Sequence, residues 1–211
     1  MSIILLKNIN KKFGNHQIFN NFDLEIDEGE FITIMGSSGK GKTTLLNMIG
    51  MIEPFNSGEM MICGQKNPKF SSSAARKLRA KKIAYLFQNY GLIDNDTVEE
   101  NLSVSAKFKN ISKKEKKDLY SKALEKVGLK GYEKRKIFTL SGGEQQRVAL
   151  AKIIVKDPEI ILADEPTGSL DAKNRDYVMQ ILKDLNKENK TIIVVTHDPV
   201  VESYAKRKIY L

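Results

Sequence analysis

The chain has 211 residues, and 35 Lys and Arg against 26 Asp and Glu give it a formal net charge of +9 at pH 7. Its 41% hydrophobic and 29% charged residues exclude a disordered or fibrous chain and predict one sizeable core with room for a small lobe. Its apolar runs, such as residues 160–163 and 192–195, are far shorter than the roughly 18 residues that cross a bilayer. We therefore expect no membrane span.

Two further features indicate a cytoplasmic protein. The N-terminal residues carry no basic leader and no small-residue cleavage site, so no secretory signal is expected. The single cysteine, Cys63, has no partner for an internal disulfide, as is usual in a reducing compartment.

The positive charge is local. Residues 66–82 hold seven basic and no acidic side chains, and residues 107–136 hold twelve basic and four acidic ones. Such segments are typical of solvated helix faces or of a surface near an anionic membrane. Because Lys dominates over Arg at helical spacing, a nucleic-acid partner is the third choice.

The first elements in chain order are strands. Residues 22–27 alternate apolar and acidic side chains, which predicts a strand exposed on one face in an antiparallel region that opens the chain. Residues 31–35 form a mostly apolar strand that runs into glycines, and residues 43–52 predict a helix. Strand, glycine loop and helix in this order indicate nucleotide binding.

The middle of the chain predicts a helical lobe. Residues 67–82 indicate a loop and a short basic helix, followed by a strand at 83–87. Between residues 96 and 129, capping residues and helical spacing predict two helices joined near 110–112. This block interrupts the alternation of strands and helices, so we expect a lobe inserted into an α/β core.

Three later elements restore the alternation. They are a buried strand at 160–163, a helix over 172–187 and a strand at 191–196.

Residues 36–43, GSSGKGKT, match the pattern GxxxxGK(S/T). A phosphate chain needs several N–H donors at once, and only a glycine-rich loop lets the backbone curl that closely around it. We expect Lys42 to reach the β- and γ-phosphates and the Thr43 hydroxyl to bind Mg²⁺. A glycine turn that merely caps a helix is the simpler alternative, which the preceding strand disfavours. The predicted phosphate-binding residues are Gly36, Ser37, Ser38, Gly39, Lys40, Gly41, Lys42, Thr43 and Thr44.

The buried strand at 160–163 ends in two carboxylates, Asp164 and Glu165. We expect Asp164 to hold Mg²⁺ through water and Glu165 to orient or deprotonate the attacking water. The alternative is an ordinary strand that ends in a polar turn.

Ser141, Gly142, Gly143 and Glu144 precede a helical pattern. The Ser and Glu satisfy a capping box, which alone would mark only a helix start. Two glycines, however, leave the helix N-terminus open to an anion. We expect this end to face the γ-phosphate bound by a second copy of the chain.

In order and approximate spacing, these motifs resemble the ATP-binding subunit of ABC transporters over essentially the whole chain. The resemblance rests on the phosphate loop, Gln88, residues 140–144, the Asp164-Glu165 strand end, Ser169-Leu170-Asp171 and His197. Within the family the sequence is similar to the MacB/LolD-type group, and more loosely to ATPases of lactococcin-type bacteriocin export systems.

The resemblance implies an α/β fold with a P-loop NTPase core of the ABC ATPase type, an N-terminal antiparallel β region and an inserted helical subdomain. It implies a single ABC ATPase domain over 1–211. We assign residues 1–88 and 138–211 to the β region and RecA-like core, and about 89–137 to the helical subdomain.

The resemblance also implies residue roles. By this resemblance Phe13 stacks on adenine; the alternative is a phenylalanine of the core. Asp171 lies in a loop that crosses to the partner subunit; the alternative is a residue that only caps the next helix. Gln88 contacts Mg²⁺ or water and begins the loop that faces the membrane subunit. His197 touches the γ-phosphate. The predicted catalytic residues are then Glu165, His197 and Gln88. The predicted metal ligands are Thr43, Gln88 and Asp164. The predicted nucleotide-binding residues are those of the phosphate loop together with Phe13, Ser141, Gly142, Gly143 and Asp171.

Two residues depart from the family pattern. Lys40 adds a cation where a small residue is usual, and Glu144 replaces a glutamine. The resemblance implies ATP and Mg²⁺ as cofactors, and a second copy and an integral membrane permease as partners. It implies a location at the inner face of the cell membrane. An FtsE-like regulator without transport and a nucleic-acid-acting ABC ATPase are the alternatives.

Overall fold

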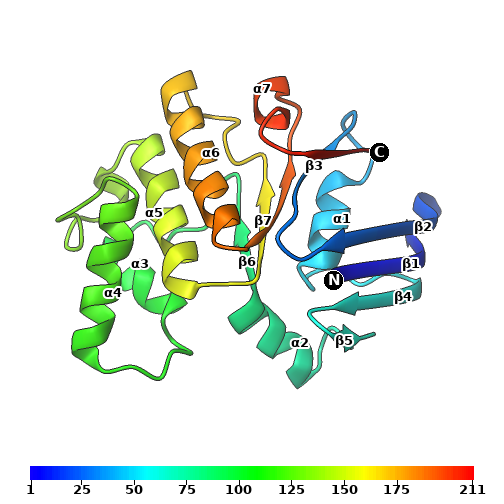
Figure 1. Cartoon of the computed structure of the whole chain (residues 1–211), viewed down its shortest axis with the longest axis horizontal. Coiled ribbons are helices and arrows are strands. Elements are labelled where there is room, and N and C mark those ends of the chain that lie inside the picture. The colour runs from blue at the N-terminus through cyan, green and yellow to red at the C-terminus, as the bar shows by residue number, and fades with distance from the viewer.

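The structure, a computed structural model, describes residues 1–211 as two sheets, with helices on both sides of the parallel one (Figure 1). One sheet is antiparallel with the order β2-β1-β4-β5, and the other is parallel with the order β6-β7-β8-β3-β9. The strands are β1 (Ser2–Phe13), β2 (His16–Asp27), β3 (Phe31–Met35), β4 (Ser57–Ile62), β5 (Gln65–Lys66), β6 (Ile83–Leu86), β7 (Ile160–Asp164), β8 (Thr191–Val195) and β9 (Arg207–Tyr210). The helices are α1 (Lys42–Ile49), α2 (Ser73–Lys77), η1 (Leu78–Lys82), α3 (Val98–Ser105), α4 (Lys113–Lys126), η2 (Ile137–Thr139), α5 (Gly142–Lys156), α6 (Ala172–Lys187) and α7 (Pro199–Glu202).

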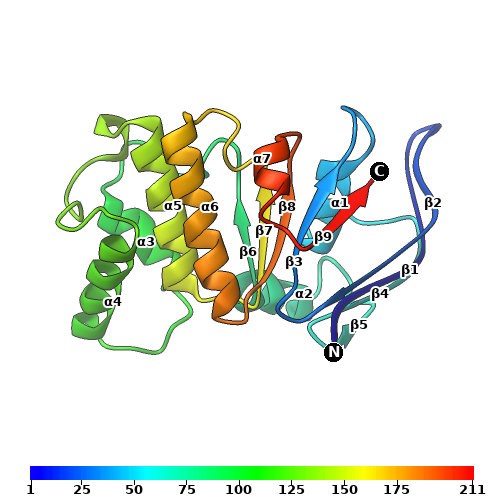
Figure 2. The same ribbon diagram turned by 45° about the horizontal axis from the view of Figure 1, so that its top comes forward.

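The antiparallel sheet confirms the amphipathic pattern near the N-terminus. Strands β1 and β2 form a long hairpin that runs from the pair Ser2 and Asp27 to the pair Phe13 and His16. On β2, Leu24 and Ile26 are buried, while the acidic residues between them are exposed. In Figure 2 the tip of this hairpin rises beside the loop between β3 and α1.

The parallel sheet forms the centre of the core. Strand β8 is buried throughout, and so are the first four residues of β7, as expected for strands covered on both faces. Because all five strands are parallel, their carboxyl ends meet at one edge. Strand β9 is an unpredicted addition beside β3; its four residues are mostly exposed and carry no strong apolar pattern.

Helices α3 and α4 pack against α5 and confirm the predicted helical lobe. Capping boxes at Thr97 and Ser112 start them where the sequence indicates. Their buried faces belong to a cluster of 29 buried residues shared with α5, α6 and the sheet. A second cluster of 23 buried residues fills the space between the two sheets and α1. The helical lobe therefore has a continuous apolar connection to the parallel sheet.

Several predicted boundaries are wrong. The helix expected over 43–52 ends at Ile49, because the Gly50 N–H closes its last turn and Met51 then adopts a left-handed backbone with φ of 58°. The strands expected over 83–87 and 191–196 each end one residue earlier, at Leu86 and Val195, and the strand expected over 160–163 continues to Asp164. No helix is both long and apolar enough to cross a bilayer.

Candidate functional site

Four predicted site segments follow four neighbouring strands. Gln88 follows β6, Asp164 ends β7, His197 follows β8, and the phosphate loop follows β3. Since the strands are parallel and adjacent, these segments meet at the carboxyl edge of one sheet. In α/β proteins this edge is where ligands bind.

The phosphate loop needs its glycines at two crowded positions. At Gly41, φ is +91°, and an added Cβ would lie 2.5 Å from Ile18 Cγ2 on strand β2. At Gly36, φ is +149°, and an added Cβ would lie 2.8 Å from the carbonyl oxygen of Leu211. The loop is therefore held between the hairpin and the C-terminal residue in a shape that larger residues cannot adopt.

The functional group of Lys42 lies inside this loop. Its Nζ donates hydrogen bonds to the carbonyl oxygens of Gly36 at 2.8 Å and Ser37 at 3.0 Å. Thr44, which carries a hydroxyl group, lies in the first turn of α1. Ser38 and Lys40 of the loop are exposed to solvent. The ammonium thus sits where a phosphate oxygen in the loop would meet it.

Asp164 and Thr43 form an oxygen-rich group at the strand end. Burial raises the pKa of Asp164, as does the nearby Glu165 charge, while a hydrogen bond with Thr43 and the charge of Lys42 act in the opposite direction. Carboxylate, hydroxyl and amide oxygens are the ligands that Mg²⁺ prefers. The residues present therefore fit the ion, with Thr43 and Asp164 as ligands or water-mediated contacts and Gln88 at the same edge.

Glu165 adopts a left-handed backbone with φ of +46°, which is rare for a residue with a Cβ. Its carboxylate Oε1 lies 2.7 Å from Nδ1 of His197, so the two predicted catalytic residues are in contact. The Glu165 side chain is 18% exposed and that of His197 is 75% exposed. The carboxylate is shielded yet within reach of an incoming water molecule, and the imidazole holds it in place.

A buried glutamine that sequence reasoning missed supports the turn after Glu165. Gln146 on α5 is 1% exposed, and its Nε2 donates to the carbonyl oxygen of Pro166 at 2.6 Å. A polar residue near a helix start suggests solvent exposure. However, Gln146 shares a helix face with Leu150 and Ile153, and this spacing could have revealed its burial.

The N-terminus of α5 is capped and bare, as the sequence predicts. The Ser141 hydroxyl accepts from the Glu144 N–H at 3.3 Å, and Glu144 Oε2 accepts from the Ser141 N–H at 2.8 Å. Glu144 also accepts a hydrogen bond from the Tyr132 hydroxyl at 2.8 Å, so the acidic replacement keeps the cap. The bonds to Ser141 and Tyr132 and the nearby Arg135 lower the pKa of Glu144.

Asp171 lies beside this helix end. It caps α6, accepting from the Asn174 N–H at 2.8 Å, and an added Cβ at Gly143 would lie 2.8 Å from the Asn174 side chain. Arg147 donates to the same Asn174 at 2.8 Å. The N-terminus of α5 and Asp171, both predicted to face a partner subunit, therefore form one surface on the side of the sheet that α5 and α6 cover. Figures 1 and 2 place α5 and α1 on opposite sides of β6, β7 and β8, so this surface lies apart from the chain's own phosphate loop.

Phe13 is on the surface, not in the core. It ends β1 at the hairpin tip, it is 48% exposed, and Lys11 Nζ lies 4.2 Å from its ring centroid. The core alternative for Phe13 is therefore wrong. An exposed ring on the hairpin beside the phosphate loop is suited to stacking on a base.

Tyr90 connects segments that sequence analysis treated separately. The Tyr90 hydroxyl oxygen lies 3.3 Å from the Ser169 hydroxyl oxygen. An added Cβ at Gly142 would lie 2.9 Å from the Tyr90 hydroxyl oxygen. Tyr90 follows Gln88 by two residues, Ser169 precedes Asp171 by two, and Gly142 begins α5. No motif in the sequence marks this tyrosine, because its partners are far away along the chain.

We expect Tyr90→Phe to lower kcat for ATP about three- to tenfold while the affinity for ATP stays within about twofold. The change removes one hydrogen bond, which contributes about 0.5–1.5 kcal/mol, beside Ser169 and the start of α5 and not at the phosphate loop. Steady-state kinetics and nucleotide titration measure the two quantities, with Tyr177→Phe on α6 as the matched control. An equal loss of affinity and turnover would contradict a positioning role.

Lys40 is exposed beside the phosphate loop. Because an exposed charge interaction contributes about 0.2–1 kcal/mol, we expect Lys40→Ser to weaken ATP binding roughly 1.4- to fivefold. Calorimetric titration of ATP measures this effect. Unchanged affinity would show that the side chain only extends into solvent.

A glycine-rich loop between a buried parallel strand and a helix, with carboxylates at the end of a nearby strand, defines a P-loop nucleoside triphosphatase. The comparisons with known proteins narrow this class. The sequence profile of the ABC transporter family matches residues 19–168, more than half of the chain. The chain therefore belongs to the ABC transporter family, and within it the MacB/LolD-type group fits.

Individual relatives agree with this assignment. The macrolide export ATP-binding/permease protein MacB of Mannheimia succiniciproducens is 39% identical over 99% of this chain and 33% of its own length. The uncharacterized ABC transporter ATP-binding protein MJ0796 of Methanocaldococcus jannaschii is 42% identical over 99% of this chain and 93% of its own. The chain thus spans about a third of the MacB proteins it matches and nearly all of MJ0796.

Solved structures give the same fold. A dimeric structure of a post-hydrolysis state of the ATP-binding cassette MJ0796, bound to ADP and Pi, superposes with a TM-score of 0.89 at 39% identity, covering 99% of this chain and 94% of that chain. The predicted α/β ABC ATPase fold is confirmed, and membership of the family makes the chain an ATPase.

Proposed function

We propose that the chain is the ATP-binding and ATP-hydrolysing subunit of a transporter and that it powers a separate membrane permease. One observation carries the proposal. The bare N-terminus of α5 and the adjoining Asp171 form a surface remote from the chain's own phosphate loop. Such an anion-binding helix end has a use if it meets the triphosphate held by a second copy.

The reaction is hydrolysis of ATP between two copies. Lys42 and the loop N–H groups hold the phosphates of one copy, and Ser141, Gly142 and Gly143 of the other copy close over the γ-phosphate. Glu165 accepts a proton from the attacking water, while His197 orients its carboxylate. When bound at Thr43, Asp164 and Gln88, Mg²⁺ supplies positive charge to the phosphate oxygens. The dimeric MJ0796 structure with ADP and Pi supports this arrangement.

Phe13 stacks on the adenine in this proposal. A ring face does not read hydrogen-bonding groups on a base edge, so the preference for ATP over GTP should be weak.

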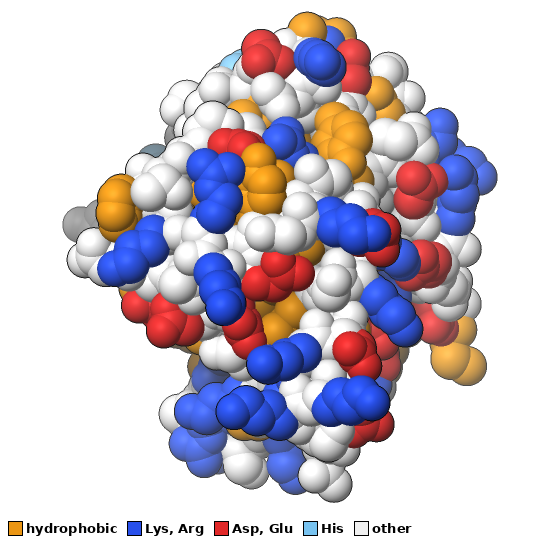
Figure 3. Space-filling model, turned by 90° about the vertical axis from the view of Figure 1, so that its left-hand side faces the viewer, with side chains coloured by type: hydrophobic (Ala, Val, Ile, Leu, Met, Phe, Trp, Pro, Cys, Tyr) orange, Lys and Arg blue, Asp and Glu red, His pale blue; other side chains and the backbone are white.

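The transported molecule is a bacteriocin or another peptide or lipophilic compound, moved outward. Two relatives that are named macrolide export ATP-binding/permease proteins support outward transport. The coupled ATPase would then lie at the inner face of the cell membrane. Figure 3 shows Lys and Arg spread over the helical side with Asp and Glu between them, and gathered most densely at the lower end. This basic surface is suited to a position close to anionic headgroups.

Co-expression with the integral membrane protein encoded beside this chain tests the proposal. We expect the two to purify together in detergent and expect ATP turnover to rise when both are placed in vesicles. A chain that purifies alone and hydrolyses ATP at an unchanged rate in the presence of that membrane protein would contradict a transporter subunit. Substrate-stimulated turnover would distinguish transport from the FtsE-like regulatory alternative.

A further inference from the structure

Strand β1 carries a buried lysine near its end, although lysine side chains are normally exposed. Lys11 is 4% exposed, and Ile9, two residues earlier, is also buried. Side chains two residues apart in a strand lie on the same face, so Lys11 occupies a position where an apolar residue is expected. The next side chain in this series is Phe13, at the tip of the hairpin.

The ammonium group of Lys11 has three partners. Its Nζ donates to Glu53 Oε1 at 2.5 Å and to the carbonyl oxygen of Pro54 at 2.7 Å. The same Nζ lies 4.2 Å from the centroid of the Phe13 ring, over the ring. An ammonium group has three N–H donors, so these three contacts use its full capacity. Lys11 therefore connects the loop after α1 to the ring at the hairpin tip.

The stability of the fold does not by itself account for this lysine. A buried ion pair loses the hydration of both charges, and apolar side chains of similar size often serve the fold equally well. The Glu53 side chain is 32% exposed and keeps part of its hydration, so the desolvation falls mainly on Lys11. A methionine would fill the same space without this cost. The contact with Phe13, in contrast, depends on a cation.

The Lys11 ammonium restricts the orientation of the Phe13 ring. A cation within about 6 Å of a ring centroid is attracted to the electron-rich face of the ring. With the ammonium on one face, the partly exposed ring of Phe13 has its opposite face for stacking on a base. A side chain that is ordered before its ligand arrives loses less conformational entropy on binding.

Lys11 also connects the base site to the phosphate site. The Glu53 N–H donates to the carbonyl oxygen of Asn47 on α1 at 3.1 Å. Helix α1 begins at Lys42 of the phosphate loop, and Figures 1 and 2 show this helix beside the hairpin. The ammonium thus joins the hairpin tip to the C-terminal end of the helix whose first turn follows the phosphate loop. This link fixes the spacing between Phe13 and that loop.

We propose that Lys11 is a positioning residue for the nucleotide base. Its ammonium holds the Phe13 ring in the orientation in which the ring stacks on adenine. Because the donors of Lys11 are already engaged, the lysine acts through the ring and not by contact with the nucleotide. This inference rests on the proposed stacking of Phe13 on adenine and names a residue that supports it.

Titration calorimetry of the isolated chain with two ligands tests the proposal. MgATP carries a base, whereas inorganic tripolyphosphate offers only the phosphate chain. We expect Lys11→Met, which keeps the length of the side chain, to weaken ATP binding about three- to tenfold. The affinity for tripolyphosphate should stay within about twofold of the wild-type value. Equal losses for both ligands, or ATP binding that is unchanged or tighter, would overturn the proposal.

Two further variants control for the fold. Lys7→Met makes the same change at an exposed position of the same strand and should keep the wild-type affinity for ATP. Lys11→Met/Glu53→Gln removes the carboxylate that the single substitution leaves unpaired, and we expect from it the same selective loss of ATP affinity. Thermal unfolding without nucleotide verifies the fold of each variant. If Lys11→Met alone does not fold, the double variant decides.

A double-mutant cycle with Phe13 shows whether the lysine acts through the ring. Phe13→Leu should weaken ATP binding at least about fivefold, since stacking on the base is lost. Adding Lys11→Met to this variant should change the affinity for ATP less than about twofold, because the ring that the ammonium holds is gone. Losses that multiply in the combined variant would overturn the proposal.

The two levels of the account fail in different ways. A loss of ATP affinity in Phe13→Leu but not in Lys11→Met would overturn the positioning role and leave the stacking of Phe13 intact. Wild-type affinity for ATP in Phe13→Leu would contradict the stacking itself, and the role of Lys11 would fall with it.

Discussion

Glu165→Gln should lower the turnover of ATP by about 10²-fold or more while ATP stays bound. Glutamine keeps the shape of the side chain, but its amide cannot accept a proton from the attacking water. The Glu165 carboxylate lies 2.7 Å from Nδ1 of His197 and does not belong to the phosphate loop. Its loss should therefore affect hydrolysis and not ATP binding. Turnover and nucleotide affinity, measured on the same preparation, check both halves of the expectation.

The variant should also accumulate as an ATP-bound dimer, because closure no longer ends in hydrolysis. Sedimentation with and without ATP measures this state. Glu159→Gln, at a surface carboxylate paired with Lys82, is a suitable control for the loss of one acidic charge. Wild-type turnover in Glu165→Gln would reject this residue as the base.

Lys42→Ala should abolish measurable nucleotide binding. The ammonium lies inside the predicted phosphate loop, 2.8 Å from the Gly36 carbonyl oxygen, where we expect it to bind phosphate oxygens. A charge-assisted hydrogen bond contributes about 1.5–3 kcal/mol, so the loss of two weakens binding by roughly 10²- to 10⁴-fold. Titration with a fluorescent ATP analogue measures the affinity.

An exposed lysine on α4, changed in Lys122→Ala, provides the control for Lys42→Ala. Thermal unfolding without nucleotide shows whether the loop variant keeps its fold. If a folded Lys42→Ala protein bound ATP as tightly as the wild type, the loop would not be the phosphate site.

Local sequence features predicted the parts of the fold that depend on local chemistry. The helix predicted over 172–187 agrees with α6, because the apolar spacing lies within the segment and the Asp171 cap directly precedes it. The buried strands β7 and β8 were recognisable as short apolar runs. Strand β9 was not recognisable, since its exposed residues are held in the sheet by β3 and not by a pattern of their own.

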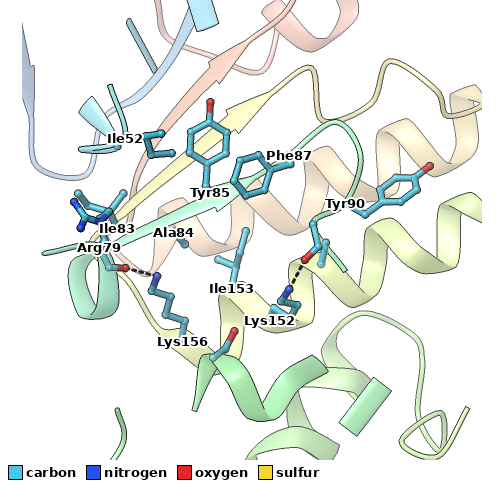
Figure 4. Close-up of a pocket in the computed structure, with 14 residues that line it drawn as sticks. Ile52, Arg79, Ile83, Ala84, Tyr85, Phe87, Tyr90, Lys152, Ile153 and Lys156 are labelled. Atoms are coloured by element: carbon cyan, nitrogen blue, oxygen red, sulfur yellow. Dashed lines mark hydrogen bonds between the residues drawn. The ribbon is translucent and has the colours of Figure 1, made fainter. Parts of the chain in front are cut away.

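The candidate site shows the same division. The phosphate loop and the strand-end carboxylates are short motifs, and the order of the parallel strands brings them to one edge. Tyr90 acts through a partner 79 residues away, so no local pattern reveals it. The helical spacing of Gln146 with Leu150 and Ile153 indicates its burial, but not its hydrogen bond to Pro166, 20 residues away. Lys152 and Lys156 look like ordinary solvent-facing residues of a helix, yet their ammonium groups donate to the carbonyl oxygens of Gly91 and Arg79 (Figure 4).

The central claim is that each ATP is cleaved between two copies of the chain. Measuring the specific ATPase activity of the isolated protein against its concentration tests this claim most directly. We predict that activity per molecule rises with concentration and reaches a plateau where sedimentation finds dimers. Constant activity per molecule, down to concentrations at which only monomers sediment, would contradict the claim.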